Sequence, residues 1–193
     1  MGGPEDERLW AAVFSSEEGA TCKQELELVR SGSDQVKLPE ELTKESSEDA
    51  AKKESKDQSD LFARIRDMSI PQKIKLAMFG NKVARGLLIR DRNKQVPLFV
   101  LQNPRLGEEE VVEFAKNTNL DELVFRAIAN NTTWMKSYHI KLNLVSNPRV
   151  PIDISLRWVK YLHDGELRIL AKSKNIPQVI ASQCRKLLEK RKN

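Results

Sequence analysis

The residue types that most often carry acid–base or metal chemistry are few and scattered in this chain. The two histidines, His139 and His163, stand 24 positions apart, and the two cysteines, Cys22 and Cys184, lie far from each other. Neither a Cys-x-x-Cys pair nor a Cys/His cluster occurs, so the spacing indicates neither a zinc site nor a disulfide framework. We therefore expect the histidines to be solvated or capping residues and Cys184 to be a buried thiol.

Other chemical motifs are incomplete. The acidic run at 108–110 follows Gly107, where carboxylates stabilise the start of a helix, and one helix turn offers too few oxygen donors for a metal ion. Segment 79–86, FGNKVARG, lacks the glycine order of a phosphate-binding loop, and no G-x-S-x-G or H-E-x-x-H motif is present. We expect no catalytic residue, no metal and no cofactor. An enzyme with an unrecognised site remains the third alternative, behind the two binding functions below.

Charge is divided unequally along the chain. Residues 1–60 hold 16 acidic and 8 basic residues, which leaves 12 acidic and 25 basic residues in 61–193, so the two parts are net −8 and net +13. An excess of this size produces a positive surface that attracts phosphates or acidic proteins, although lysines and arginines also solvate helix faces without binding a partner. The candidate residues for binding a polyanion or a partner are Lys73, Lys75, Lys82, Arg85, Arg90, Arg92, Lys94, Arg105, Arg149, Lys172 and Lys174.

The first 60 residues have the composition of an acidic tail. Segment 32–60 has no aromatic residue and few large aliphatic ones, so it cannot bury enough apolar surface to offset the entropy of ordering. We expect it to be disordered. Segment 1–31 contains ERLWAAVF, which would place Trp10 and Phe14 on one side of a short helix. Two interpretations stay open: a tail with transient helix, or a short motif in which Trp10 and Phe14 anchor in a partner's groove.

From Leu61 onward, apolar residues recur at the helical spacing of three and four. Polar caps divide this run into short helices, with N-caps expected at Ser69, Asn119, Asp164 and Asn175. The helix ends share a pattern of an aliphatic or small residue, any residue, then Asn or Asp. It occurs at 89–91, 101–103, 115–117, 129–131 and 145–147, with a weaker form at 171–173. Asparagine suits a helix end because it tolerates left-handed backbone and can bond to nearby backbone groups.

The triplet Asn-Pro-Arg occurs at 103–105 and again at 147–149, 44 residues later. An ungapped comparison at this offset places apolar residues on apolar residues, including Phe114 on Trp158 and Phe125 on Ile169. Short helices that cannot each bury a face must stack, so we expect both triplets to occupy equivalent corners between helices. Trp134 and Tyr138 are expected to share one helix face. The residues expected to be mostly buried are Leu123, Phe125, Leu142, Leu156, Trp158, Leu167, Leu170 and Leu187.

Corners such as LVSNPRVP between short helices resemble the leucine-rich repeat variant family and, more broadly, HEAT-like helical repeats. The resemblance covers roughly residues 71–190 and implies a right-handed α-superhelix used as a binding surface. Some members hold an iron–sulfur centre through a cysteine cluster, which this chain lacks, so that cofactor is not carried over. The stretch from SIPQKIKLAMFG to LVSNPRVP also looks like a group of uncharacterised bacterial proteins, which suggests a bacterial origin and supplies no activity.

Together these patterns predict an all-α chain, with a disordered acidic tail over 1–60 and a basic short-helix repeat domain over 61–193. The sequence has no apolar run long enough for a membrane span and no signal-peptide pattern, so we expect a cytoplasmic protein without membrane contact. The predicted function is a non-enzymatic interaction or scaffolding module that binds an unidentified protein partner. The alternative is binding of nucleic acid, or another polyanion, through the basic face.

Overall fold

The computed structural model describes residues 42–43 and 63–192, and no strand occurs among them. The described residues fall into two compact units. We call the described residues up to Leu106 the N-terminal unit and those from Gly107 onward the C-terminal unit. The all-α prediction is confirmed for this part of the chain. Most of the predicted tail, including Trp10 and Phe14, lies outside the described residues.

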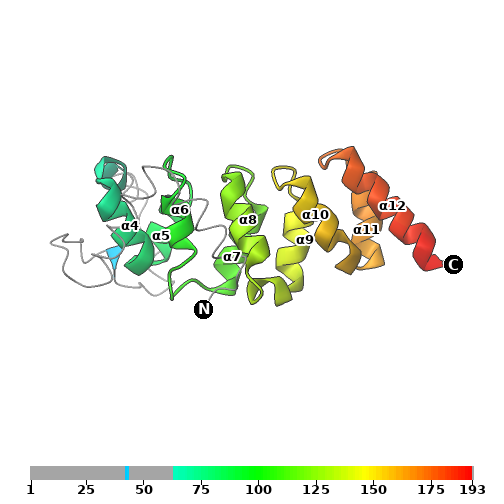
Figure 1. The fold of residues 1–193 in the computed structure, drawn as a ribbon, viewed down its shortest axis with the longest axis horizontal. Coiled ribbons are helices and arrows are strands. Elements are labelled where there is room, and N and C mark those ends of the chain that lie inside the picture. The colour runs from blue at the N-terminus through cyan, green and yellow to red at the C-terminus, as the bar shows by residue number, and fades with distance from the viewer. Residues whose placement is uncertain (1–41, 44–62, 193) are drawn as a thin grey trace, which may run out of the picture. The chain divides into compact units, whose positions relative to one another are not determined.

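The N-terminal unit contains a short helical stretch at 63–67, followed by α4 (Ile70–Phe79), α5 (Lys82–Leu88) and α6 (Val96–Val100) (Figure 1). Helix α4 packs against both α5 and α6. All five residues of α6 are buried, and Pro97 in its first turn fits because the fixed φ of proline suits a helix start. The core of the unit is formed by Ile74, Leu76, Ala77, Ala84, Leu88, Leu98 and Phe99.

The C-terminal unit is a succession of short helices. They are α7 (Glu108–Lys116), α8 (Glu122–Asn130), η3 (Trp134–Lys136), α9 (Tyr138–Ser146), α10 (Ile152–Trp158), η4 (Val159–Tyr161), α11 (Asp164–Lys172) and α12 (Gln178–Lys192). Helix α7 packs against α9, α9 against α10, and α12 against both α10 and α11. None of the helices described here has the length and apolar character needed to cross a bilayer.

At two helix starts, the side chain of the third helical residue accepts a hydrogen bond from the backbone N of the N-cap residue. The carboxamide Oε1 of Gln72 accepts a hydrogen bond from the backbone N of Ser69 at 2.9 Å, as predicted for the start of α4. The same contact joins Glu110 to the backbone N of Gly107 at 3.3 Å at the start of α7. The acidic run therefore serves a helix start, as predicted.

Three predicted caps are wrong. Helix α12 begins at Gln178, so Asn175 is not its cap. Helix α8 is capped by Asp121, whose carboxylate accepts from the backbone N of Leu123 at 3.0 Å, and Asn119 lies in the preceding turn. Helix α11 has His163 at its N-cap, and Asp164 is its first helical residue. An acidic residue is stabilising throughout the first turn because of the helix dipole, so its presence alone does not fix which residue is the cap.

The predicted helix ends are confirmed, and one of the two expected reasons for asparagine, bonding to nearby backbone groups, holds. Side-chain oxygens of Asp91, Asn103, Asn117, Asn131 and Asn147 each accept a hydrogen bond from the backbone N two residues later, at 2.8–3.0 Å. Ser173 does the same at 3.2 Å. The backbone of Asn117, Asn131 and Asn147 is extended rather than left-handed, with φ of −71°, −76° and −88°. Asparagine is therefore favoured for its side-chain turn.

Burial in the C-terminal unit corrects the ungapped comparison. Of the residues expected to be buried, Phe125, Leu167 and Leu170 are, while Leu123, Leu142, Trp158 and Leu187 are partly buried. Leu156 is 38% exposed, and Ile169 is 70% exposed although its counterpart Phe125 is buried. Helices α7 and α10 begin 44 residues apart, but α8 and α11 begin only 42 apart. Two residues turn a helix by about 200°, which moves a side chain from the core to the solvent.

The prediction that Trp134 and Tyr138 share a helix face is also wrong. Trp134 begins the 3₁₀ turn η3, whereas Tyr138 begins α9. Ser137 between them has extended backbone, with φ −66° and ψ 128°. The two aromatic side chains therefore belong to separate elements.

Candidate interaction site

The first Asn-Pro-Arg triplet follows α6 and ties it to the end of α4. The Asn103 side chain is buried, and its Nδ2 donates to the carbonyl oxygens of Ala77 at 2.9 Å and Gly80 at 3.2 Å. Its Oδ1 accepts from the backbone N of Arg105 at 2.8 Å. The Asn103 side chain thus donates to carbonyl groups at the C-terminus of α4, which have no partner within the helix. Its bond to the backbone N of Arg105 also forms the turn that follows α6.

The second triplet makes the same arrangement in the C-terminal unit. The buried Asn147 follows α9, and its Nδ2 donates to the carbonyl oxygens of Ala115 at 2.8 Å and Asn117 at 3.1 Å, at the end of α7. Its Oδ1 accepts from the backbone N of Arg149 at 3.0 Å. Both triplets lie at corners between helices, as predicted. An asparagine that follows α6 thus caps α4, and an asparagine that follows α9 caps α7.

A different side chain performs this capping a third time. Arg191 lies 44 residues after Asn147. Its guanidinium donates to the carbonyl oxygens of Leu162 and Lys160, both at 2.8 Å, at the end of η4. It also contacts the carboxylate of Asp164 at 2.6 Å. A search for Asn-Pro-Arg misses this position because the residue type differs.

The N-terminal unit also holds two residues that are distant in sequence, Leu42 and Thr43. The Leu42 side chain is 1% exposed, and its carbonyl oxygen accepts from the backbone N of Asn81 at 2.8 Å. The carbonyl oxygen of Thr43 accepts from Nη1 of Arg105 at 2.8 Å. Two main-chain carbonyls of a polypeptide segment are therefore bound at the first Asn-Pro-Arg corner, and the Leu42 side chain is buried. The predicted tail contributes these two residues to the described structure.

Arg85 is part of this corner rather than of a binding surface. Its side chain is 2% exposed, and Nη1 donates to the carbonyl oxygen of Gly80 at 3.0 Å. Asn81, the N-cap of α5, accepts from the backbone N of Ala84 at 3.0 Å. The prediction that Arg85 contacts a polyanion is wrong, because a buried guanidinium held by a main-chain carbonyl cannot meet a ligand in solvent.

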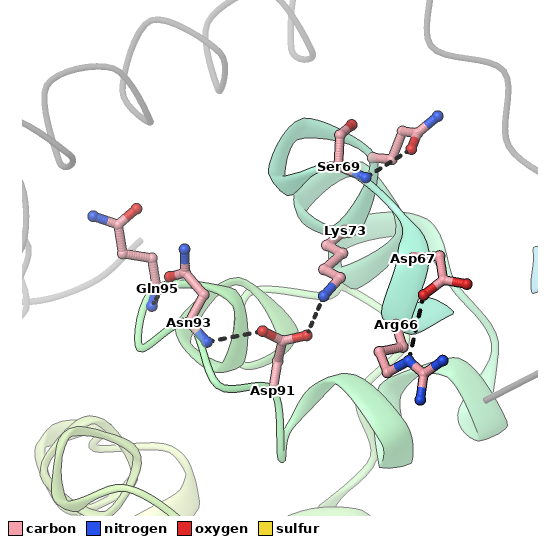
Figure 2. A network of polar contacts seen from close by, with 8 residues as sticks. Arg66, Asp67, Ser69, Lys73, Asp91, Asn93 and Gln95 are labelled. Atoms are coloured by element: carbon pink, nitrogen blue, oxygen red, sulfur yellow. Dashed lines mark hydrogen bonds and ion pairs between the residues drawn. The ribbon is translucent and has the colours of Figure 1, made fainter. Parts of the chain in front are cut away.

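A basic loop joins α5 to α6. Asp91 Oδ2 accepts from Nζ of Lys73 at 2.9 Å, Asp91 Oδ1 accepts from the backbone N of Asn93 at 2.8 Å, and Asn93 Oδ1 accepts from that of Gln95 at 2.8 Å (Figure 2). Residues 91, 93 and 95 are thereby partly or fully buried. The alternate positions are exposed, and each is basic: Arg90, Arg92 and Lys94. We call these three residues the basic loop.

Lys73 supports this loop and is not displayed on the surface. Its side chain is 13% exposed and that of its ion-pair partner Asp91 is 11% exposed. The pair joins α4 to the loop (Figure 2). Binding of a polyanion by Lys73 would therefore have to compete with this ion pair.

The remaining predicted binding residues are distributed over both units. Arg105 is exposed but holds the carbonyl of Thr43, and Lys75 is partly buried. The structure brings together only part of the predicted set, namely the basic loop. The exposed members outside that loop and the corner are Lys82, Arg149, Lys172 and Lys174.

Acidic residues are scarce around the basic loop. Residues 63–106 contain ten basic and two acidic residues. The two acids are already in ion pairs, Asp67 with Arg66 at 3.3 Å and Asp91 with Lys73 at 2.9 Å. Within this described segment, no further carboxylate is available to neutralise the basic loop.

One of the two histidines, His163, makes structural contacts. The ring of His163 stacks on that of Tyr138 with centroids 4.5 Å apart, and the Tyr138 hydroxyl accepts from the backbone N of His163 at 3.0 Å. Burial raises the pKa of Tyr138. His139 is exposed. Cys184 is buried, as predicted, and burial raises the pKa of its thiol.

Sequence reasoning missed the corner contacts of Leu42, Asn81 and Arg191. Leu42 stands among Glu40, Glu41 and Lys44, a composition that gives no sign of burial. The position of Arg191, 44 residues after Asn147, was the one available signal for its role. Comparisons of the chain with protein-family models, with curated proteins and with solved structures find no match. The resemblance to helical-repeat families therefore rests on the sequence pattern.

Proposed function

We propose that this protein is a non-enzymatic interaction module in which short stacked helices present a basic surface to an acidic protein segment. The observation that carries this proposal is the basic loop. Its three cationic side chains are exposed on a turn held by Asp91 and Asn93, and both acids of the surrounding segment are already in ion pairs. An acidic ligand would gain charge-assisted contacts without breaking an ion pair of the scaffold.

Two features favour a protein segment as the ligand. Residues 90–95 include no aromatic side chain, so the loop has no platform on which a nucleobase could stack. The same unit already binds main-chain carbonyls at the first Asn-Pro-Arg corner, namely those of Leu42 and Thr43. A polypeptide ligand is thus compatible with contacts that this unit already makes.

Binding of nucleic acid is the second candidate. Two of the three exposed side chains of the basic loop are arginines, and the guanidinium group matches the geometry of phosphate oxygens. Such binding would be directed at the phosphate backbone and would be insensitive to base sequence.

We also propose that the helices form a right-handed superhelix of the leucine-rich repeat variant or HEAT-like kind. The support is local and repeated: α4–α6 and α7–α9 each end in an asparagine that caps the first helix of the group. A recurrent cap of this kind is what a repeated three-helix building block requires.

One experiment separates the two candidate ligands. The full chain is titrated with a labelled glutamate-rich peptide and with a labelled single-stranded oligonucleotide of equal charge, over a series of salt concentrations. The proposal expects the peptide to bind more tightly near physiological ionic strength. Tighter binding of the oligonucleotide, with a steep fall in affinity from counterion release, would instead establish the second candidate. Binding of neither probe would refute both.

A further inference from the structure

We propose that the corner formed by Gly80–Asn81 and Asn103–Arg105 is a binding site for a leucine-containing polypeptide segment. In this structure the chain's own Leu42 occupies the site, and a partner segment of the same chemistry binds there in exchange. This inference deepens the proposed function, because the ligand is again a polypeptide. It uses different residues, however, and does not depend on the basic loop.

The first hydrogen-bond donor of this site, the backbone N–H of Asn81, is oriented by buried side chains. The carbonyl of Gly80 and the N–H of Asn81 belong to one planar peptide group and point in opposite directions. Two buried side chains, those of Arg85 and Asn103, donate to that carbonyl at 3.0 and 3.2 Å. Anchoring the carbonyl directs the Asn81 N–H toward the carbonyl of Leu42, which it contacts at 2.8 Å.

The second donor is positioned by the same asparagine. Asn103 Oδ1 accepts from the backbone N of Arg105 at 2.8 Å, and the Arg105 guanidinium donates to the carbonyl of Thr43 at 2.8 Å. Asn103 therefore organises both donors, one through each end of its carboxamide. Two successive main-chain carbonyls of the bound segment are recognised in this way.

The apolar part of the site is a leucine. In the C-terminal unit, a leucine is present in the chain itself before the helices α8 and α11. In the C-terminal unit, the residue before each second-helix N-cap is a buried leucine: Leu120 before Asp121, and Leu162 before His163. The corresponding residue in the N-terminal unit is Gly80, before Asn81. A Cβ at Gly80 would overlap the carbonyl oxygen of Leu76, so this place cannot carry a leucine of its own.

Leu42 is a buried leucine whose main chain is bound at this place. Its side chain is 1% exposed, and its carbonyl is bonded to Asn81, the residue that follows Gly80. The ligand chemistry follows from these contacts. It is a leucine whose side chain is buried, followed by one residue whose main-chain carbonyl is bound.

The second Asn-Pro-Arg corner provides a matched control. Arg149 is presented by the same turn as Arg105, through the 3.0 Å hydrogen bond from its backbone N to Asn147. Its side chain is exposed, and within the described residues it holds no carbonyl of a distant segment. Replacing Arg149 therefore removes an equivalent arginine without touching the proposed site.

In the test, the chain is cleaved so that only non-covalent contacts can hold the segment that contains Leu42 and Thr43. A protease site is inserted between Glu54 and Ser55 of the full chain, the chain is cleaved, and gel filtration shows whether residues 1–54 remain with the rest. We expect retention at low micromolar concentration. A labelled peptide of residues 36–48 in excess should displace the fragment, and the same peptide with Leu42→Asp should not.

Variants then assign the contacts. Leu42→Ala and Arg105→Ala should each weaken retention at least tenfold, whereas Arg149→Ala should leave it unchanged, with helical content checked by circular dichroism. Loss of the wild-type fragment on cleavage, or failure of the peptide to compete, would overturn the inference. The inference would also be overturned if the triple variant Arg90→Gln/Arg92→Gln/Lys94→Gln released the fragment while Leu42→Ala did not. That last result would leave the proposed function standing.

Discussion

The buried side chain of Asn147 has the same kinds of partner in its unit as that of Asn103 has in its own. Each donates to a carbonyl in the last turn of the first helix and to the carbonyl of the residue that ends it, and each accepts from the arginine two residues later. The intervening proline has no N–H, so the arginine N–H is the nearest donor. Asn117 and Asn131 accept the same bond without a following proline or arginine, so these contacts account for the recurring asparagine.

The first prediction concerns these two asparagines. Asn103→Ala and Asn147→Ala should each lower the free energy of unfolding by about 1–3 kcal/mol, because carbonyl groups lose a buried donor. The exposed Asn119 is the control, and Asn119→Ala should change stability by less than about 0.5 kcal/mol. Urea denaturation followed by circular dichroism measures the difference. Equal shifts for all three variants would mean that the corners add no particular stability.

The second prediction compares two leucines that the sequence did not distinguish. Leu167 is fully buried in the cluster of α9, η4, α11 and α12, whereas Leu156 is 38% exposed. Leu167→Ala should cost about 2–5 kcal/mol of stability because it leaves a cavity, and Leu156→Ala should cost less than about 1 kcal/mol. Thermal or urea denaturation provides the measurement. A larger loss for Leu156→Ala would place the core on the other face of α10.

The third prediction concerns the support of the basic loop. Asp91→Asn keeps the acceptor for Asn93 but removes the ion pair with Lys73, whose side chain is 13% exposed. We expect a loss of about 1–3 kcal/mol and faster amide hydrogen exchange at residues 90–95. Asp67→Asn is the control, because its pair with Arg66 is largely exposed and should contribute less than about 1 kcal/mol. Identical exchange in both variants would show that Lys73 does not hold the loop.

The fourth prediction follows from the buried thiol. Burial raises the pKa of Cys184, and only the thiolate reacts with iodoacetamide. In a Cys22→Ser variant at neutral pH, alkylation should be much slower than for a free thiol, and it should reach the free-thiol rate in denaturant. Rapid alkylation under native conditions would indicate that α12 detaches readily from the core.

The sequence predicted the helices and their corners because capping and side-chain turns are local. Ser69, Gln72 and the asparagines at helix ends act within a few residues of their partners. The helix phase in α11 was wrong because the comparison assumed equal linkers, and a difference of two residues moved Ile169 to the surface. Local pattern thus predicts where helices end better than which face is buried.

The candidate site was only partly predictable, because its members meet through tertiary contacts. Nothing near Lys73 or Arg85 in the sequence distinguishes them from Arg90 or Arg92, yet the first two are held by Asp91 and Gly80. Leu42 lies 39 residues before Asn81, in a polar segment. Burial of a single leucine in such a segment depends on the surface that receives it and leaves no periodic signal.

The central claim is tested most directly by measuring the affinity of the full chain for a labelled glutamate-rich peptide. Three proteins are compared by fluorescence anisotropy at about 0.1 M salt, where the Debye length is about 10 Å. They are the wild type, the loop variant Arg90→Gln/Arg92→Gln/Lys94→Gln, and a control, Lys116→Gln/Lys136→Gln/Lys186→Gln. The control loses the same charge from exposed lysines of the C-terminal unit. Three exposed contacts of about 0.5 kcal/mol each predict that the loop variant binds about tenfold more weakly and the control almost as tightly as the wild type. Equal weakening of both variants would show that net charge, and not the basic loop, determines binding and would contradict the proposed function.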